Sequence, residues 1–121
     1  MKTLILALLI GSVCFAQGHQ ATITWAPNTA TSTTDLPTQY NILRGTTSGG
    51  ESATPIGNTL ASACSPTTCT YIDSTVAGGQ TYFYEITAQN SGGTSAPSPE
   101  VSVAIPLFPP GIPSKPTIVG K

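Results

Sequence analysis

The sequence is poor in charged side chains. Its 121 residues include four Lys and Arg, five Asp and Glu and one His, so only 7% of the chain is charged, whereas an average soluble domain carries about 25%. It contains no run of basic residues, and such runs supply the attraction on which binding to nucleic acids and to anionic membranes depends. The composition therefore argues against a nucleic-acid partner and against a membrane-surface protein.

Groups suited to acid–base catalysis are equally scarce. An active site needs several titratable side chains that converge in one pocket, and a single His with a few dispersed carboxylates offers no such cluster. The sequence also has no phosphate-binding glycine loop with its lysine, no nucleophile elbow and no metal-binding pair of histidines. We therefore predict that the protein is not an enzyme and has no catalytic residues, no bound metal and no cofactor.

Residues that interrupt helices are abundant. Twelve Gly and eleven Pro break the chain too often for long helices, and the frequent Thr and Ser residues favour strands and turns, respectively. The length suits one domain. The composition therefore predicts an all-β fold.

The first sixteen residues have the features of a secretory signal peptide. A basic start at Lys2 precedes an apolar stretch over residues 4–13 and a small-residue site that ends at Ala16. The apolar stretch is too short to span a bilayer as a helix. Cleavage after Ala16 predicts a secreted, extracellular protein without membrane attachment. The alternative is a lipoprotein signal acylated at Cys14, against which Val13 stands where such signals have a small residue.

Two cysteines, Cys64 and Cys69, remain after this cleavage. Export exposes them to an oxidising environment, and the four residues between them, which include Pro66, suit a turn that brings the sulfurs together. This spacing predicts a local disulfide, whose short loop limits its entropic stabilisation to about 2 kcal/mol. A structural zinc site would need four donors, and the only His is distant in sequence.

Alternation of apolar and polar residues predicts six strands. The clearest cover residues 21–25 and 81–90, and the others cover residues 39–44, 54–60, 70–73 and 100–105. Six short strands at this spacing predict a β-sandwich. The predicted core consists of inward positions on these strands, namely Ile23, Trp25, Tyr40, Ile42, Tyr82, Tyr84, Ile86, Val101 and Val103.

The chain resembles the fibronectin type III module found in secreted bacterial proteins. The similarity covers residues 20–105 and lies in the strand that ends in TW at Trp25, in YNILRGT, in VAGGQTY, which ends at Tyr82, and in NSGGTSAPS. It implies an immunoglobulin-like sandwich in which Trp25 is the core tryptophan. It also implies that Tyr82 is a corner tyrosine, whose hydroxyl bonds to the backbone upstream.

The chain departs from this family at its start. A complete module begins with a strand A, whereas only residues 17–20 separate the predicted cleavage site from the tryptophan strand. The resemblance therefore implies that residues 17–105 form a sandwich without its own strand A. One strand edge would then be unpaired, and it offers no charge that would protect it from pairing with another chain. This expected acceptor strand consists of Ala21, Thr22, Ile23 and Thr24.

Residues 106–121 form a Pro-rich, extended tail. Its five prolines disfavour a tight reversal and stiffen the segment. The end of the tail looks like the strand A that opens a second module, and sixteen extended residues span at most about 55 Å, which is longer than a module. We therefore expect a donor strand that consists of Pro116, Thr117, Ile118 and Val119.

Together these features lead to the hypothesis of a secreted structural protein that assembles head to tail. The tail of one subunit would complete the sandwich of the next, with Ile118 or Val119 entering the core. Because the donor and acceptor surfaces differ, the contact is heterologous and produces an open homopolymeric filament.

Three alternatives stay open. The tail folds back within its own chain, it is an idle extension of a monomer, or the protein is a monomeric adhesion or carbohydrate-associated module that binds through polar loops. The Thr- and Ser-rich faces also predict O-linked glycans, whereas the sequence has no N-glycosylation site.

Overall fold

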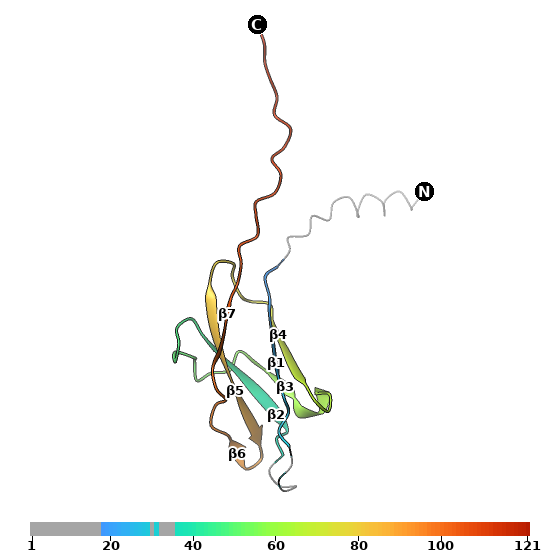
Figure 1. Cartoon of the computed structure of the whole chain (residues 1–121), viewed down its shortest axis with the longest axis vertical. Coiled ribbons are helices and arrows are strands. Elements are labelled where there is room, and N and C mark those ends of the chain that lie inside the picture. The colour runs from blue at the N-terminus through green and yellow to red at the C-terminus, as the bar shows by residue number, and fades with distance from the viewer. Residues whose placement is uncertain (1–17, 30, 32–35) are drawn as a thin grey trace, which may run out of the picture.

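The chain folds into β-strands that form two antiparallel sheets, in agreement with the predicted all-β class (Figure 1). The computed structural model describes residues 18–29, 31 and 36–121, so the predicted signal peptide lies outside the described residues. Within these ranges, no helix is long and apolar enough to cross a membrane. The elements are β1 (Ala21–Trp25), β2 (Gln39–Gly45), β3 (Gly57–Leu60), the 3-10 turn η1 (Ala61–Ala63), β4 (Cys69–Asp73), β5 (Thr81–Asn90), β6 (Gly93–Thr94) and β7 (Val101–Ala104).

Most strands lie where the alternation predicts them. β1 and β5 coincide with the predicted strands, whereas β3 begins at Gly57, three residues after its predicted start. Pro55 lacks the N–H that a sheet ladder needs, which explains the late start. The two-residue strand β6 is not among the predicted strands because so short a segment carries no alternation.

The two sheets differ in size. In the smaller one, β1 pairs with β4. The larger one has the order β3-β2-β5, and the outer side of β5 is shared by β6 at one end and β7 at the other. All of these pairings are antiparallel.

Two serines continue the pairing along β5 between β6 and β7. Ser95 and Ser98 donate their backbone N–H groups to the carbonyls of Ala88 and Ile86, both at 2.8 Å. In return their hydroxyls accept the N–H groups of the same two β5 residues, both at 2.9 Å. Prolines stand on both sides of Ser98 and have no N–H to donate, so the serine hydroxyls satisfy this edge of β5.

The core lies between the two sheets. Six predicted core residues are buried there, whereas Trp25 and Val103 pack against them at partly buried positions. The Trp25 ring meets the Tyr40 ring edge-on, with centroids 5.5 Å apart. The prediction for Val101 is wrong, because its side chain is 55% exposed. The buried six are Ile23, Tyr40, Ile42, Tyr82, Tyr84 and Ile86.

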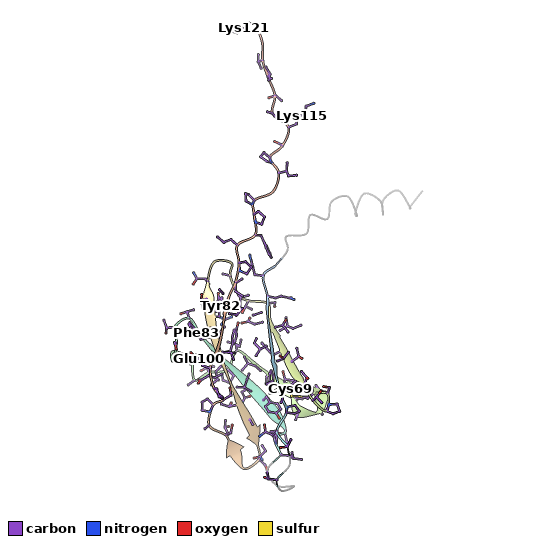
Figure 2. All side chains as sticks on the ribbon, viewed as in Figure 1. Cys69, Tyr82, Phe83, Glu100, Lys115 and Lys121 are labelled. Atoms are coloured by element: carbon purple, nitrogen blue, oxygen red, sulfur yellow. A yellow bond between two sulfur atoms is a disulfide. The ribbon has the colours of Figure 1, made fainter. Side chains whose placement is uncertain are left out.

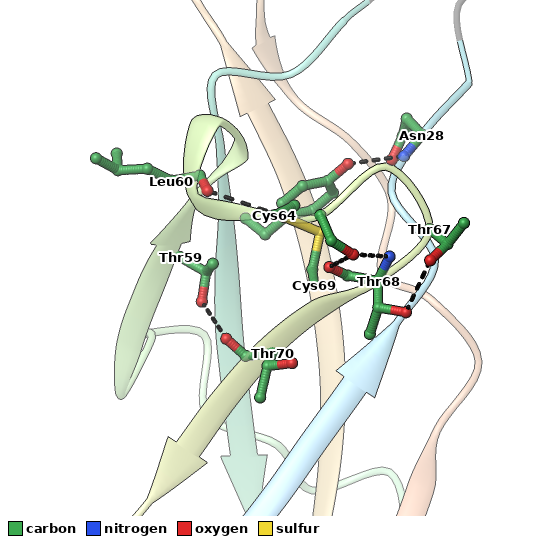
Figure 3. The surroundings of a disulfide bond; sticks show 10 residues. Asn28, Thr59, Leu60, Cys64, Thr67, Thr68, Cys69 and Thr70 are labelled. Atoms are coloured by element: carbon green, nitrogen blue, oxygen red, sulfur yellow. Dashed lines mark hydrogen bonds between the residues drawn. A yellow bond between two sulfur atoms is a disulfide. The ribbon is translucent and has the colours of Figure 1, made fainter.

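Cys64 and Cys69 form the predicted disulfide (Figure 3). It connects the segment after η1 to the first residue of β4, which pairs with Trp25 in β1. Between the cysteines, Ser65 and Thr68 close a turn through the Ser65 N–H to Thr68 carbonyl bond of 2.9 Å. The disulfide therefore fixes the end of the smaller sheet at which β4 begins and β1 ends.

A buried carboxylate joins the two sheets. Asp73 at the end of β4 is 2% exposed and accepts hydrogen bonds from the Arg44 guanidinium and the Tyr84 hydroxyl of the larger sheet, both at 2.8 Å. Thr75 adds its backbone N–H and its hydroxyl. Burial by itself raises the pKa of the Asp73 carboxyl, but these hydrogen bonds outweigh it and hold the pKa below its ordinary value.

A tyrosine hydroxyl fastens the turn before β5. The Tyr82 hydroxyl accepts the backbone N–H of Ala77 at 3.0 Å, five residues upstream. The Arg44 guanidinium lies 5.0 Å from the centroid of the same ring. This contact to upstream backbone is the one that the family resemblance implies for Tyr82.

The Asp73 cluster should make stability depend on pH. Because folding lowers the pKa of Asp73, its contribution is complete above the unfolded pKa of about 3.9 and is lost as the pH falls through the lower folded value. We expect Asp73→Asn to lower the free energy of unfolding at neutral pH by about 2–4 kcal/mol, because Arg44 loses its buried partner. Urea denaturation at a series of pH values measures both effects.

Glu85→Gln is the matched control, because it removes a carboxylate outside this cluster. Below about pH 4 the unfolding free energy of the control should fall as in the natural protein, whereas that of Asp73→Asn should fall less steeply. Equal slopes for the two variants would contradict the role given to Asp73.

Candidate docking groove beside strand β1

β1 has one paired and one unpaired edge. All five of its residues pair with β4, and no other described strand pairs with it. In an antiparallel pair, alternate residues direct their N–H and C=O groups away from the partner. The second edge of β1 therefore presents a row of unpaired backbone donors and acceptors. It is the edge of the expected acceptor strand, in which Ala21 and Ile23 are buried and Thr22 and Thr24 are exposed.

A hollow of about 220 Å³ lies between this edge and β7. Its first wall is the predicted acceptor segment, residues 21–24, and its other wall consists of Val101, Ser102 and Val103, with Tyr84 also in the lining. Val101 is exposed because it faces this open space. Val101 pairs with the buried Tyr84 of β5, so it lies on the face of β7 toward the core, but the described residues leave it largely uncovered.

A second hollow of about 260 Å³ is lined by the last residue of β1, Trp25, and by Tyr40 and Ile86 from the other sheet. A third, of about 360 Å³, shares Asn28, Ala88 and Ser95 with it. The three hollows follow β1 and the loop beyond it, and together we call them the β1 groove. Its root end is where β1 begins, and its loop end is at Asn28 and residues 92–95.

The indole N–H of Trp25 is enclosed and has no hydrogen-bond partner among the described residues. Leaving a buried donor unpaired costs about 1–3 kcal/mol. The predicted core role of Trp25 gives no indication of this vacant hydrogen bond.

The lining of the first two hollows contains no Asp, Glu, Lys, Arg or His. The described residues also contain no group of three His, Cys, Asp or Glu side chains that would hold a metal ion. The first two hollows therefore offer no charged side chain to a bound segment.

A carboxylate pair lies elsewhere, where the turn after β2 meets the start of β7. Glu100 accepts the Ser48 hydroxyl and the Gly49 N–H, both at 2.7 Å. Interaction with the neighbouring Glu51 carboxyl, followed by these two bonds, lowers the pKa of Glu100, and the same interaction raises the pKa of Glu51. The pair connects two surface segments and does not belong to the groove lining.

The tail extends away from the sheets and into solvent (Figure 2). Residues 106–121 form no strand or helix, and all of them are exposed. The predicted donor residues Pro116, Thr117, Ile118 and Val119 do not contact their own β1 groove; Ile118 is 92% exposed and Val119 88% exposed. Within one chain, the structure thus keeps the expected donor and the expected acceptor apart.

The tail and the body carry opposite charge. Residues 17–105 contain one Arg and five carboxylates, a formal side-chain charge of −4, whereas the tail contains Lys115 and Lys121 and no acidic side chain. Opposite charges of this size attract over a Debye length, which is about 8 Å at physiological ionic strength. The two parts of the chain therefore have complementary formal charges.

The exposure of Val101 makes a prediction about stability. In dilute protein, Val101→Thr should change the free energy of unfolding by less than about 1 kcal/mol, because its side chain faces an open groove. Ile42→Thr, the matched control at a fully buried position on β2, should cost about 2–4 kcal/mol because it removes buried apolar atoms and buries a hydroxyl. Urea denaturation measures both. Equal losses of unfolding free energy in Val101→Thr and Ile42→Thr would mean that the groove is closed in solution.

Neither the models of known protein families nor the curated proteins match this chain.

Proposed function

We propose that the protein is a secreted, non-enzymatic structural subunit that forms an extracellular filament. In this proposal its body is a fibronectin type III-like sandwich without strand A, and the C-terminal tail of one copy occupies the β1 groove of the next. The observation that carries the proposal is the open, uncharged groove beside an unpaired strand edge, in the same chain as an exposed apolar tail.

The chemistry of the tail fits the chemistry of the groove. The edge of β1 offers backbone hydrogen bonds, and the groove offers Val101 and Val103 as apolar contacts. In the donor segment Ile118 and Val119 are adjacent, so in an extended conformation one of them faces the groove and the other faces solvent. Burying one such side chain contributes about 1.5–3 kcal/mol to the free energy of association.

Donation to a second copy is favoured over a return to the same chain. To reach its own β1, the tail would have to reverse direction within a segment that contains Pro109, Pro110 and Pro113. Proline fixes φ near −65° and stiffens such segments in an extended form. The observed tail continues straight away from the body (Figure 1).

Secretion is supported by two independent features. The Cys64–Cys69 disulfide suits an oxidising compartment, and the first sixteen residues have the charge and hydropathy pattern of a signal peptide.

Removal of the donor segment tests this function. We expect a mature chain that ends at Pro110 to sediment as a monomer at concentrations where the full mature chain forms larger species. A peptide of residues 111–121 should then bind this shortened chain and shift the fluorescence of Trp25, the only tryptophan in the sequence. Sedimentation velocity and a fluorescence titration are the measurements. A full chain that stays monomeric at high concentration would favour the monomeric binding module.

In a bound strand successive side chains point to opposite faces, and this alternation provides a sharper test. Ile118→Asp and Val119→Asp place the same charge on opposite faces of an extended segment. One of the two should weaken association by about 10- to 100-fold, the loss that corresponds to one buried aliphatic side chain. The other should have little effect. Equal effects would mean that the tail does not bind as a strand.

A further inference from the structure

The root end of the β1 groove is bridged by the chain itself. The ring of His19, two residues before β1, stacks on the ring of Phe108 in the tail, with centroids 4.1 Å apart and an interplanar angle of 11°. β1 and β7 form the two walls of the groove, and this stack connects the residues at the root ends of both walls. An incoming segment therefore meets a closed end at this position.

The turn before β5 holds this bridge in place. A Cβ atom on Gly78 would lie 2.6 Å from Nε2 of His19 and 3.1 Å from the carbonyl oxygen of Pro106, so a larger residue there would displace the His19 ring. Gly79, at φ 81°, donates its N–H to the carbonyl of Ile105 at 2.7 Å. The first residues of the tail are thus fixed to the body, and the free part of the tail begins after Phe108.

Among the described residues, the groove continues past the last residue of β1 at its loop end. The hollow beside Trp25 continues into the hollow lined by Asn28, Pro37 and residues 92–95. At this end the Trp25 ring meets the Tyr40 ring edge-on and the Asn28 N–H donates to the Tyr40 hydroxyl at 2.7 Å, so these contacts join β1 and the loop beyond it to β2 and not to β7. Of the two ends, the root end is thus the one at which a ring stack connects the wall of β1 to the wall of β7.

We propose that the tail of a second copy enters the β1 groove at the loop end and pairs antiparallel to β1, so that all copies in the assembly have the same orientation. This inference rests on the proposed function. A strand that enters where β1 ends and runs toward where β1 begins is antiparallel to it. Every described strand pair of the protein has this arrangement.

The geometry of the tail supports the same polarity. The tail leaves the body at the root end and continues along the long axis of the molecule (Figure 1). A copy placed in the same orientation presents its loop end to this tail. The residues from Pro109 to Lys121 span at most about 45 Å, and the path from Ala21 to Asn28 is about 26 Å long. About 19 Å are then left to cross the gap between two bodies.

The competing arrangement is a closed dimer. Two copies that exchange tails with their root ends facing each other would each insert a strand parallel to β1, and the assembly would stop at two. That arrangement needs each tail to enter at the end where His19 and Phe108 already stack. The stack therefore selects an open, polar assembly over a closed one.

Cross-linking between differently marked copies tests the polarity. Acceptor chains carry Ala26→Cys near the loop end or Gln20→Cys near the root end, and donor chains carry Ser114→Cys or Gly120→Cys. Acceptor and donor chains are mixed and treated with a short bismaleimide. We expect Ala26→Cys to cross-link to Ser114→Cys and Gln20→Cys to cross-link to Gly120→Cys, with the two exchanged combinations at background.

Failure of the proposed polarity and failure of the proposed function would give different cross-linking results. Cross-links in the exchanged combinations would show a parallel strand and overturn the polarity while the proposed function stands. No cross-link in any combination would overturn strand donation itself, and the polarity with it.

The role of the stack needs its own variant. Phe108→Ala removes the ring that bridges the root end and leaves β1 and the donor segment unchanged. We expect this variant to gain cross-links between Gln20→Cys and Ser114→Cys, together with a dimer in sedimentation velocity. Leu107→Ala, its exposed neighbour, is the matched control and should behave as the natural protein does. A Phe108→Ala variant that keeps the natural cross-link pattern would show that the stack does not set the direction.

Discussion

β1 satisfies its backbone along one edge only, and the rest of the structure is organised around this constraint. A strand at the open edge of a sheet with an apolar face needs either a cover or a partner. In this protein the edge borders a groove that reaches the core, because β1 and β7 are not joined by a strand between them. The exposure of Val101 results from this missing contact.

A sheet of two strands is marginal on its own, so β1 and β4 depend on connections to the larger sheet. Asp73 supplies the strongest connection through Arg44 and Tyr84. The Thr59 hydroxyl adds a bond of 3.2 Å to the carbonyl of Thr70 on β4 (Figure 3). Because a buried carboxylate is stable only when its hydrogen bonds are complete, this polar cluster fixes one relative position of the two sheets. The groove therefore has defined walls even without an occupant.

Much of the fold follows from the order of residues along the chain. Alternation identifies β1 and β5 to the residue, since each strand has one face toward the core. The spacing of Cys64 and Cys69 identifies the disulfide. These features are local, and local patterns report which face of a strand is apolar.

The features that alternation does not reveal depend on contacts between distant parts of the chain. Val101 has the pattern of a core residue, and its exposure depends on whether another strand lies beside β7. Similarly, His19 and Phe108 are 89 positions apart, and nothing in either local sequence indicates that their rings stack. The position of β1 is therefore predictable from sequence, whereas the second wall of the groove and the stack at its root end are not.

The serine hydroxyls that bond to β5 have a consequence for the shape of any assembly. They accept the backbone N–H groups of β5 along that side of the larger sheet. The prolines beside the serines have no N–H group that could pair with a further strand. A newly arriving chain cannot extend the larger sheet along this segment, because the groups it would need are already bonded. In the proposed filament this segment of β5 is therefore closed to further strands, which disfavours layered, amyloid-like stacking along it.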